Sequence, residues 1–110
     1  MDVTHVRVDQ TVTVIPDNAF NDHKKLEQVE LPEGLIRIGR DAFENCSALE
    51  SITIPSTVQE IGYSAFSNCD KLDGIVLPEG LQRLEEYAFY NCLSLQRINI
   101  PPNLRAIREA

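Results

Sequence analysis

The sequence contains little of what several protein classes require. It has no tryptophan and only two histidines, and its 10 basic residues are outnumbered by 17 acidic ones, which gives a formal net charge of −7. A protein that binds a nucleic-acid backbone shows a basic stripe instead, so we expect no nucleic-acid partner. No run of about 20 apolar residues is present, so we expect no insertion into a membrane. Three cysteines do not make a disulfide scaffold in an acidic chain of this size.

Signals for enzymatic chemistry and for secretion are also missing. The sequence has no Gly-x-Ser-x-Gly elbow, no His-Glu-x-x-His pair, and no glycine-rich loop of the phosphate-binding or dinucleotide-binding type. Its acidic residues are spread along the chain rather than paired, so we expect neither an enzyme nor a cofactor. The opening residues, Met1 to His5, lack a basic segment followed by an apolar stretch, which favours an intracellular location for the chain as written.

A period of 23 residues organises the chain. Each of the four phenylalanines follows an alanine, and consecutive phenylalanines are 23 residues apart. Each of the three cysteines follows an asparagine at the same interval, and four of the six prolines keep it as well. A fixed period of about 20 to 50 residues is the signature of a stacked-repeat protein. The columns are Phe20, Phe43, Phe66 and Phe89; Cys46, Cys69 and Cys92; and Pro32, Pro55, Pro78 and Pro101.

Within one repeat, the apolar spacing predicts a short strand and a compact return segment. Near the end of 49–54, two isoleucines alternate with serine and threonine, which is typical of a half-buried strand that stops before Pro55. Residues 41–49 place apolar side chains three and four positions apart, which favours one or two helical turns. Each coil alone cannot bury its apolar side, whereas a column of coils can, so we expect a repeat solenoid.

A repeat string carries a resemblance to a known family. Read from Leu49 to Cys69, Leu-x-x-Ile-x-Ile-Pro-x-x-Val-x-x-Ile-Gly-x-x-Ala-Phe-x-Asn-Cys resembles the BspA-like, or Treponema-type, leucine-rich repeats, and the likeness extends over residues 3–110. It implies a right-handed α/β solenoid dominated by β-structure, with short parallel strands on a concave face and with turns and short helical segments on the other side. It also implies an interaction module rather than an enzyme, in a family that includes bacterial surface adhesins.

The repeats divide the chain into coils of one leucine-rich-repeat domain, 1–110. A solenoid normally needs a polar cap on its last coil, and none follows Leu104 and Ile107. We therefore expect end-to-end self-association, and we interpret the chain as a piece of a longer array or as a short protein whose open end a partner covers. The predicted units are a degenerate first coil at 1–25, full repeats at 26–48, 49–71 and 72–94, and a truncated repeat at 95–110.

The cysteine column suggests a metal or redox site, which its geometry disfavours. With His23 in the same register, four potential ligands lie in one line. Stacked strands are about 4.8 Å apart, whereas zinc ligands lie about 2.0–2.3 Å from one ion. Free cysteine is among the most buried residue types, so we assign the cysteine and phenylalanine columns to the core and expect no metal. Asn45-Cys46-Ser47 matches a glycosylation sequon, which is more simply a coincidence within the repeat.

The outward positions of the predicted strands are the candidate functional surface. They vary between copies while the inward positions stay apolar, as expected where packing constrains only one of the two sets. The candidate binding face on the predicted concave side comprises Gln28, Glu30, Ser51, Thr53, Gly74, Val76, Arg97 and Asn99, and an acidic margin beside it comprises Glu27, Glu50, Asp73, Glu33 and Glu79.

This surface favours a function in binding. An acidic margin suits a protein or peptide partner of basic character, although such charges are also common on plain solvated surfaces. Two alternatives stay open: a structural spacer within a longer array, and an adhesin-like or glycan-binding module, which only the resemblance suggests. The face lacks aromatic residues, which binding hot spots favour. Tyr63, Tyr87 and Tyr90 fall on the other side of the predicted coil and cannot supply them.

Overall fold

The structure is a computed structural model of the chain, and it describes all residues except 1–2, 100, 103, 105 and 108–110. The described residues form short strands joined by turns, and none of them forms a helix, so none forms a helix able to cross a membrane. The strands are β1 (His5–Arg7), β2 (Val14–Ile15), β3 (Gln28–Glu30), β4 (Arg37–Ile38), β5 (Ser51–Ile52), β6 (Glu60–Ile61), β7 (Gly74–Ile75), β8 (Arg83–Leu84), β9 (Arg97–Ile98) and β10 (Ala106–Ile107).

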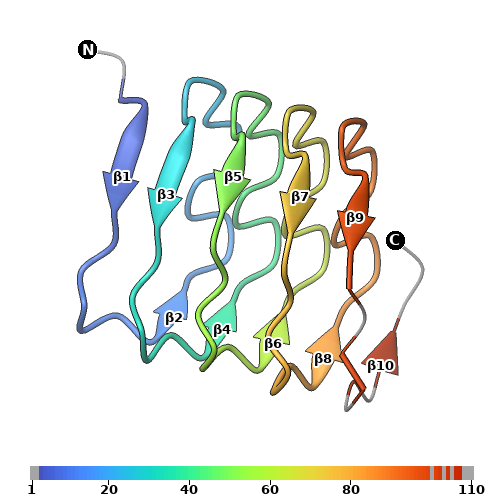
Figure 1. The fold of residues 1–110 in the computed structure, drawn as a ribbon. Helices are drawn as coiled ribbons and strands as arrows, with labels where there is room; N and C mark the ends of the chain where they lie inside the picture. Colours follow the sequence, from blue (N-terminus) through green and yellow to red (C-terminus); the bar gives the residue numbers. More distant parts are fainter. Residues whose placement is uncertain (1–2, 100, 103, 105, 108–110) are drawn as a thin grey trace.

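Odd-numbered and even-numbered strands form two separate layers of a coil stack (Figure 1). In the first layer, β1, β3 and β5 pair in one sheet and β7 pairs with β9 in another. In the second layer, β2, β4, β6, β8 and β10 form a single five-stranded sheet. All pairs are parallel and one repeat apart, as His5 with Gln28 and Arg37 with Glu60 show. The predicted β-dominated repeat solenoid is therefore confirmed.

The return segments are turns, so the prediction of short helical segments is wrong. Within 41–49, Asp41 and Asn45 have φ values of 56° and 62°, and the equivalent residues of the other coils are also left-handed. A left-handed residue interrupts a right-handed helix, and Asn and Asp tolerate that conformation better than most residues. The left-handed residue leaves N–H groups of the turn free to donate to the next coil, as the Phe43 N–H does to the Ala65 carbonyl oxygen at 2.8 Å.

The asparagines that precede the cysteines link the coils by their side chains. The Nδ2 atom of Asn68 donates to Oδ1 of Asn45 at 2.9 Å, and Nδ2 of Asn45 donates to Oδ1 of Asp22 at 2.6 Å. Asn45 and Asn68 also carry positive φ values. Asparagine therefore serves two purposes at this position, because it accepts the turn conformation and continues a line of amide hydrogen bonds.

Aromatic rings form a continuous stack inside the coils. The centroids of consecutive phenylalanine rings are 5.2, 5.2 and 5.5 Å apart, and neighbouring planes differ by 9° or less. Phe43 and Phe66 are fully buried, whereas Phe20 in the first coil is half-buried. Each inner ring therefore has an aromatic neighbour on both faces, which adds to the free energy gained by burying apolar surface.

Each cysteine thiol bonds to the coil before its own. The Sγ atoms of Cys46, Cys69 and Cys92 donate to phenylalanine carbonyl oxygens at 3.2, 3.2 and 3.0 Å. Burial raises the pKa of Cys46 to about 12 and that of Cys92 to about 11, and it also raises the pKa of Cys69. In the part of the chain that the structure describes, no cluster of three His, Cys, Asp or Glu side chains is placed to hold a metal ion.

The last coil leaves apolar side chains incompletely covered. Ile98 in β9 is 38% exposed, whereas Ile75, at the same position one coil earlier, is 5% exposed. Leu95 and Leu104 are only partly buried against the core. The side chain of Ile107 lies outside the described residues. End-to-end association through this coil stays a prediction.

Candidate functional site

The first candidate surface is the solvent-facing side of β1, β3, β5, β7 and β9, which we call the strand face. Side chains alternate along it, so that Ser51 and Thr53 are exposed while Ile52 between them is 7% exposed. This alternation follows from the two-residue period of a strand. Of the candidate residues on this face, Gln28, Glu30, Ser51, Thr53, Val76, Arg97 and Asn99 are exposed and Gly74 is half-buried.

Two neighbouring hollows indent the strand face. The first has a volume of about 660 Å³ and lies over β1, β3 and β5, where the charged side chains of Arg7, Glu30 and Glu33 line it. The second has a volume of about 640 Å³ and lies over β5, β7 and β9, where Ile54 and Val76 contribute apolar surface. Ser51, Ile52 and Thr53 line both hollows, so the two adjoin at β5; together we call them the depression, which is charged at one end and more apolar at the other.

The negative charges beside this depression are largely uncompensated. Arg7 Nε lies 3.4 Å from Glu30 Oε1, but both side chains are at least 69% exposed, so the pair contributes no more than about 1 kcal/mol. Among the described residues, no ion pair involves the acidic margin. Glu33, Glu50, Asp73 and Glu79 of that margin are exposed, and Glu27 is half-buried.

Two residues at the apolar end of the strand face differ in what they offer a ligand. Asn99 is already engaged, because its Oδ1 accepts from Leu77 N–H at 2.8 Å and its Nδ2 donates to the Leu77 carbonyl oxygen at 3.0 Å. Val76 is 75% exposed, although its two neighbours in the sequence, Ile75 and Leu77, are buried. Val76 is therefore available for contact with a ligand, while the Asn99 amide supports the backbone.

A second surface, which the sequence did not single out, lies on the turns that follow β4, β6 and β8; we call it the turn face. The ring of Tyr87 meets those of Tyr63 and Tyr90 edge to face, with centroids 5.7 and 5.4 Å apart. The three side chains are 40%, 38% and 47% exposed in sequence order. Arg40 places its guanidinium carbon 5.5 Å from the centroid of the Tyr63 ring. Tyr63, Tyr87 and Tyr90 belong to three different repeat columns, so no periodic signal groups them.

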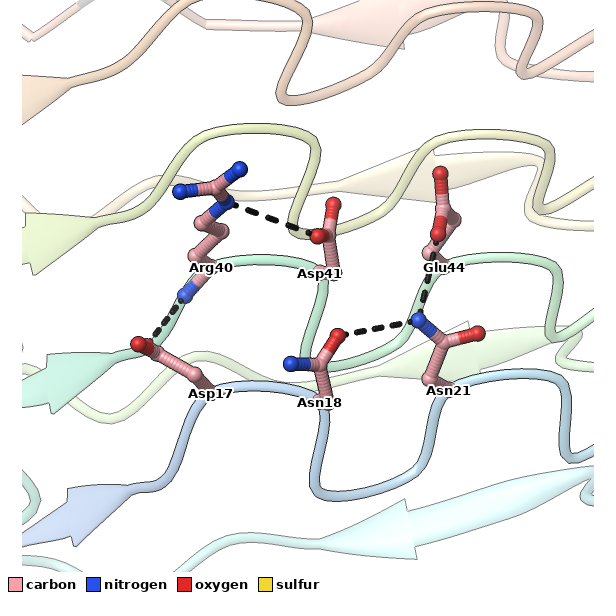
Figure 2. A network of polar contacts seen from close by, with 6 residues as sticks. All are labelled: Asp17, Asn18, Asn21, Arg40, Asp41 and Glu44. Carbon is pink, nitrogen blue, oxygen red and sulfur yellow. Dashed lines mark hydrogen bonds and ion pairs between the residues drawn. The ribbon is translucent and has the colours of Figure 1, made fainter.

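Polar side chains fill the corresponding turns of the first two coils (Figure 2). The Asp17 carboxylate accepts the backbone N–H of Arg40 at 2.9 Å, and Arg40 Nε lies 3.6 Å from Asp41 Oδ2. The Asn21 amide donates to Glu44 of the next coil at 3.2 Å. These turns are complete without aromatic rings, so the fold does not itself require the tyrosines of the later coils.

The coil geometry and the repeat columns agree with one family. The model of the BspA type leucine-rich repeat region matches residues 1–110 with six copies of the repeat. The chain belongs to the BspA-type leucine-rich-repeat family. Leucine-rich repeats of this kind generally act as protein-interaction modules and are typically not enzymes. No curated protein sequence matches the chain.

Solved bacterial structures share this BspA-type fold. A leucine-rich repeat protein of Bacteroides ovatus is 37% identical with a TM-score of 0.86 over 90% of this chain, and the T. pallidum leucine-rich repeat protein is 35% identical with a TM-score of 0.88 over 89%. A leucine-rich cell surface protein of Faecalibacterium prausnitzii is 33% identical with a TM-score of 0.88 over 94%. The matched regions make up 26%, 46% and 27% of those chains, so this chain spans less than half of each.

Proposed function

We propose that this chain is a non-enzymatic interaction module that binds a protein or peptide through the strand face. The observation that carries the proposal is the depression over β1 to β9, whose lining includes exposed side chains such as Glu30, Thr53 and Val76. A surface formed by strands whose backbones are hydrogen-bonded to one another is preorganised, so a ligand that fits it loses little binding free energy to ordering the receptor.

The two ends of the depression suit different parts of one ligand. Glu30 and Glu33 at the charged end favour a basic side chain, and Val76 and Ile54 at the other end favour an apolar one. Four coil steps of about 4.8 Å separate β1 from β9, so an extended peptide of about six residues bridges the two ends. The partner we propose therefore carries a basic residue and an apolar residue within one short extended segment.

Charge substitutions along one column of the strand face test the proposal. Glu30→Lys, Thr53→Lys and Val76→Lys place a cation on three successive coils, and Gln82→Lys is the matched control, since Gln82 is exposed next to β8 in the other layer. Proteins captured by the immobilised chain are identified by mass spectrometry and compared between variants. We expect the strand-face variants to lose partners that the control keeps. Retention of every partner by all three, with loss in the control, overturns the assignment to this face.

A structural spacer within a longer array is the second candidate function. It is favoured by the 38% exposure of Ile98 in β9, where earlier coils cover the equivalent side chain with the next coil. A spacer needs no ligand of its own, so in that case the strand-face variants and the control capture the same proteins. The same capture experiment therefore distinguishes the two functions.

A further inference from the structure

The tyrosines of the turn face point to a second binding surface, independent of the strand face. We propose that Tyr63, Tyr87 and Tyr90 receive an arginine-bearing segment of a protein partner. They are all the tyrosines that the sequence contains, and each is at least 38% exposed. Tyrosine and arginine are the residues that dominate the energetic centres of interfaces, because they combine a large apolar area with polar groups.

The other coils show that packing does not require aromatic residues at these positions. Every equivalent residue in the preceding coils is polar or charged, and those coils have the same backbone pairing along the turns. An exposed aromatic cluster therefore replaces residues that would interact better with water. The equivalents are Asp17 and Arg40 for Tyr63; Asn18, Asp41 and Ser64 for Tyr87; and Asn21, Glu44 and Ser67 for Tyr90.

The backbone at Tyr87 gives a second, separate reason to assign a function to the cluster. Its φ is 62°, in the left-handed region that large side chains rarely adopt. Asn18 and Asp41 hold this conformation at the same position in other coils, and their short polar side chains tolerate it far better. A residue kept in an unfavourable conformation where a better one is available marks a site at which binding outweighs stability.

The turn face already binds one guanidinium group from its own chain. Arg40 lies over the Tyr63 ring at 5.5 Å, and the Asp41 carboxylate lies 3.6 Å from Arg40 Nε. This combination of an aromatic face and a carboxylate is the recognition chemistry for arginine. It identifies the class of side chain that the neighbouring rings suit.

One coil further along, the same chemistry is present without a cation. Tyr87 and Tyr90 supply two rings, and the exposed Glu86 beside Tyr87 supplies a carboxylate. Within the described residues, no basic side chain lies over either ring or forms an ion pair with Glu86. The net charge of −7 adds a long-range attraction for a basic segment. An arginine from a partner would therefore occupy at Tyr87 the kind of position that Arg40 holds at Tyr63.

Tyrosine emission provides a direct assay of this surface. Because the chain has no tryptophan and its only three tyrosines lie in the cluster, intrinsic emission reports the turn face alone. The probe is the amidated peptide Gly-Ser-Arg-Gly-Arg-Ser-Gly, with the citrulline version of the same peptide as the uncharged control. We expect a saturable change in emission with the arginine peptide and none with citrulline. No change with the arginine peptide, or a change with the neutral oligosaccharide cellohexaose instead, overturns the proposal.

Variants taken from the chain's own repeats separate binding from folding. Tyr87→Asn and Tyr90→Ser introduce residues that other coils carry at these positions, so both variants are expected to fold, which circular dichroism verifies. Fluorescence anisotropy of the labelled arginine peptide measures affinity. We expect each variant to bind roughly five-fold more weakly, whereas Gln82→Ser, at an exposed position outside both proposed binding surfaces, binds unchanged. Unaltered affinity in the folded tyrosine variants, or equal loss in Gln82→Ser, contradicts the proposed location.

Discussion

The buried thiols give a quantitative prediction about the reactivity of the native chain. The thiolate is the reactive form of cysteine, and with the ordinary pKa of 9.0 about a tenth of a thiol is ionised at pH 8. Burial raises the pKa of Cys46 to about 12, which leaves about one thiolate in 10,000 at that pH. Alkylation of Cys46 is then about 1,000-fold slower in the folded chain than in the unfolded chain. For Cys92, with a pKa of about 11, the factor is about 100.

The position of each cysteine in the stack predicts the order in which the three thiols are alkylated. Cys69 is completely buried and has a thiol neighbour in the coil on either side, whereas Cys92 is half-buried in the more exposed last coils. We expect iodoacetamide to label Cys92 first, Cys46 next and Cys69 last. Timed quenching at pH 8, followed by digestion with a protease that cleaves after glutamate and by mass spectrometry, resolves the three sites, because glutamates lie between each pair of cysteines. The same reaction in urea supplies the unfolded reference rate.

Two results would refute this reasoning. If all three thiols react in the native chain within about three-fold of their unfolded rates, the cysteine column is not shielded and a redox or metal-binding role becomes the better interpretation. If Cys69 reacts fastest, the thiol is activated rather than buried, and the raised pKa is wrong in direction. Slow reaction at all three positions, in the expected order, is the outcome that a structural column requires.

Four further perturbations have expected outcomes. Gly62→Ala places Cβ 2.9 Å from backbone atoms and lowers the unfolding free energy by about 1–3 kcal/mol in urea titrations, whereas Gly74→Ala, with nothing within 4 Å, does not. Phe66→Leu removes two stacked ring contacts and lowers the free energy of unfolding by about 1–3 kcal/mol; a decrease below about 0.5 kcal/mol contradicts a stabilising role of the stack. Because thiols ionise at lower pH in the unfolded chain than in the folded one, the contribution of Cys46 to the free energy of unfolding is complete below pH 9. It falls by up to about 1.4 kcal/mol per pH unit as the pH rises toward the raised pKa of Cys46, about 12. Urea titrations at pH 8 and pH 10 measure this loss, and equal unfolding midpoints at the two pH values contradict it. Ile98→Lys abolishes concentration-dependent association in sedimentation, and a strictly monomeric parent chain refutes the open end.

The repeat period alone predicted the stack because backbone pairing and side-chain packing share one register. Residues 23 apart pair directly, as Val29 does with Ile52, so a column of like residues in the sequence becomes a column of touching residues in the fold. The sequence also predicted which side of the strands faces inward, because side chains alternate between the two sides and Ile52, between two polar residues, is 7% exposed. Any sequence in which one interval aligns every aromatic core position permits this inference.

The return segments and the second strand layer required information that spacing does not contain. Apolar residues three and four apart occur both in a helical turn and in consecutive tight turns, and only the left-handed φ of Asp41 and Asn45 distinguishes them. The strands of the second layer, such as β4 at Arg37–Ile38, have two residues each. Two residues are too few to show alternation, so their pairing depends on the neighbouring coils rather than on local sequence.

The turn face was missed for a related reason, which also shows where binding information lies in a repeat protein. Packing makes the inward columns alike, so the positions at which coils differ are the ones free to serve a ligand. Tyr63, Tyr87 and Tyr90 each depart from the other residues of a different repeat column. They come into contact only because the turn after β6 lies next to the turn after β8 in the folded stack. Since stability in such stacks is a sum of nearest-neighbour terms, the contact among these rings depends on the later coils staying packed against the earlier ones. Ile98 at that end is 38% exposed, and it lies closer to the tyrosine cluster than to the charged hollow over β1 and β3 in the order of the coils. Covering the last coil would therefore stabilise the tyrosine cluster and the apolar hollow over β5, β7 and β9 more than the charged hollow at the other end of the strand face.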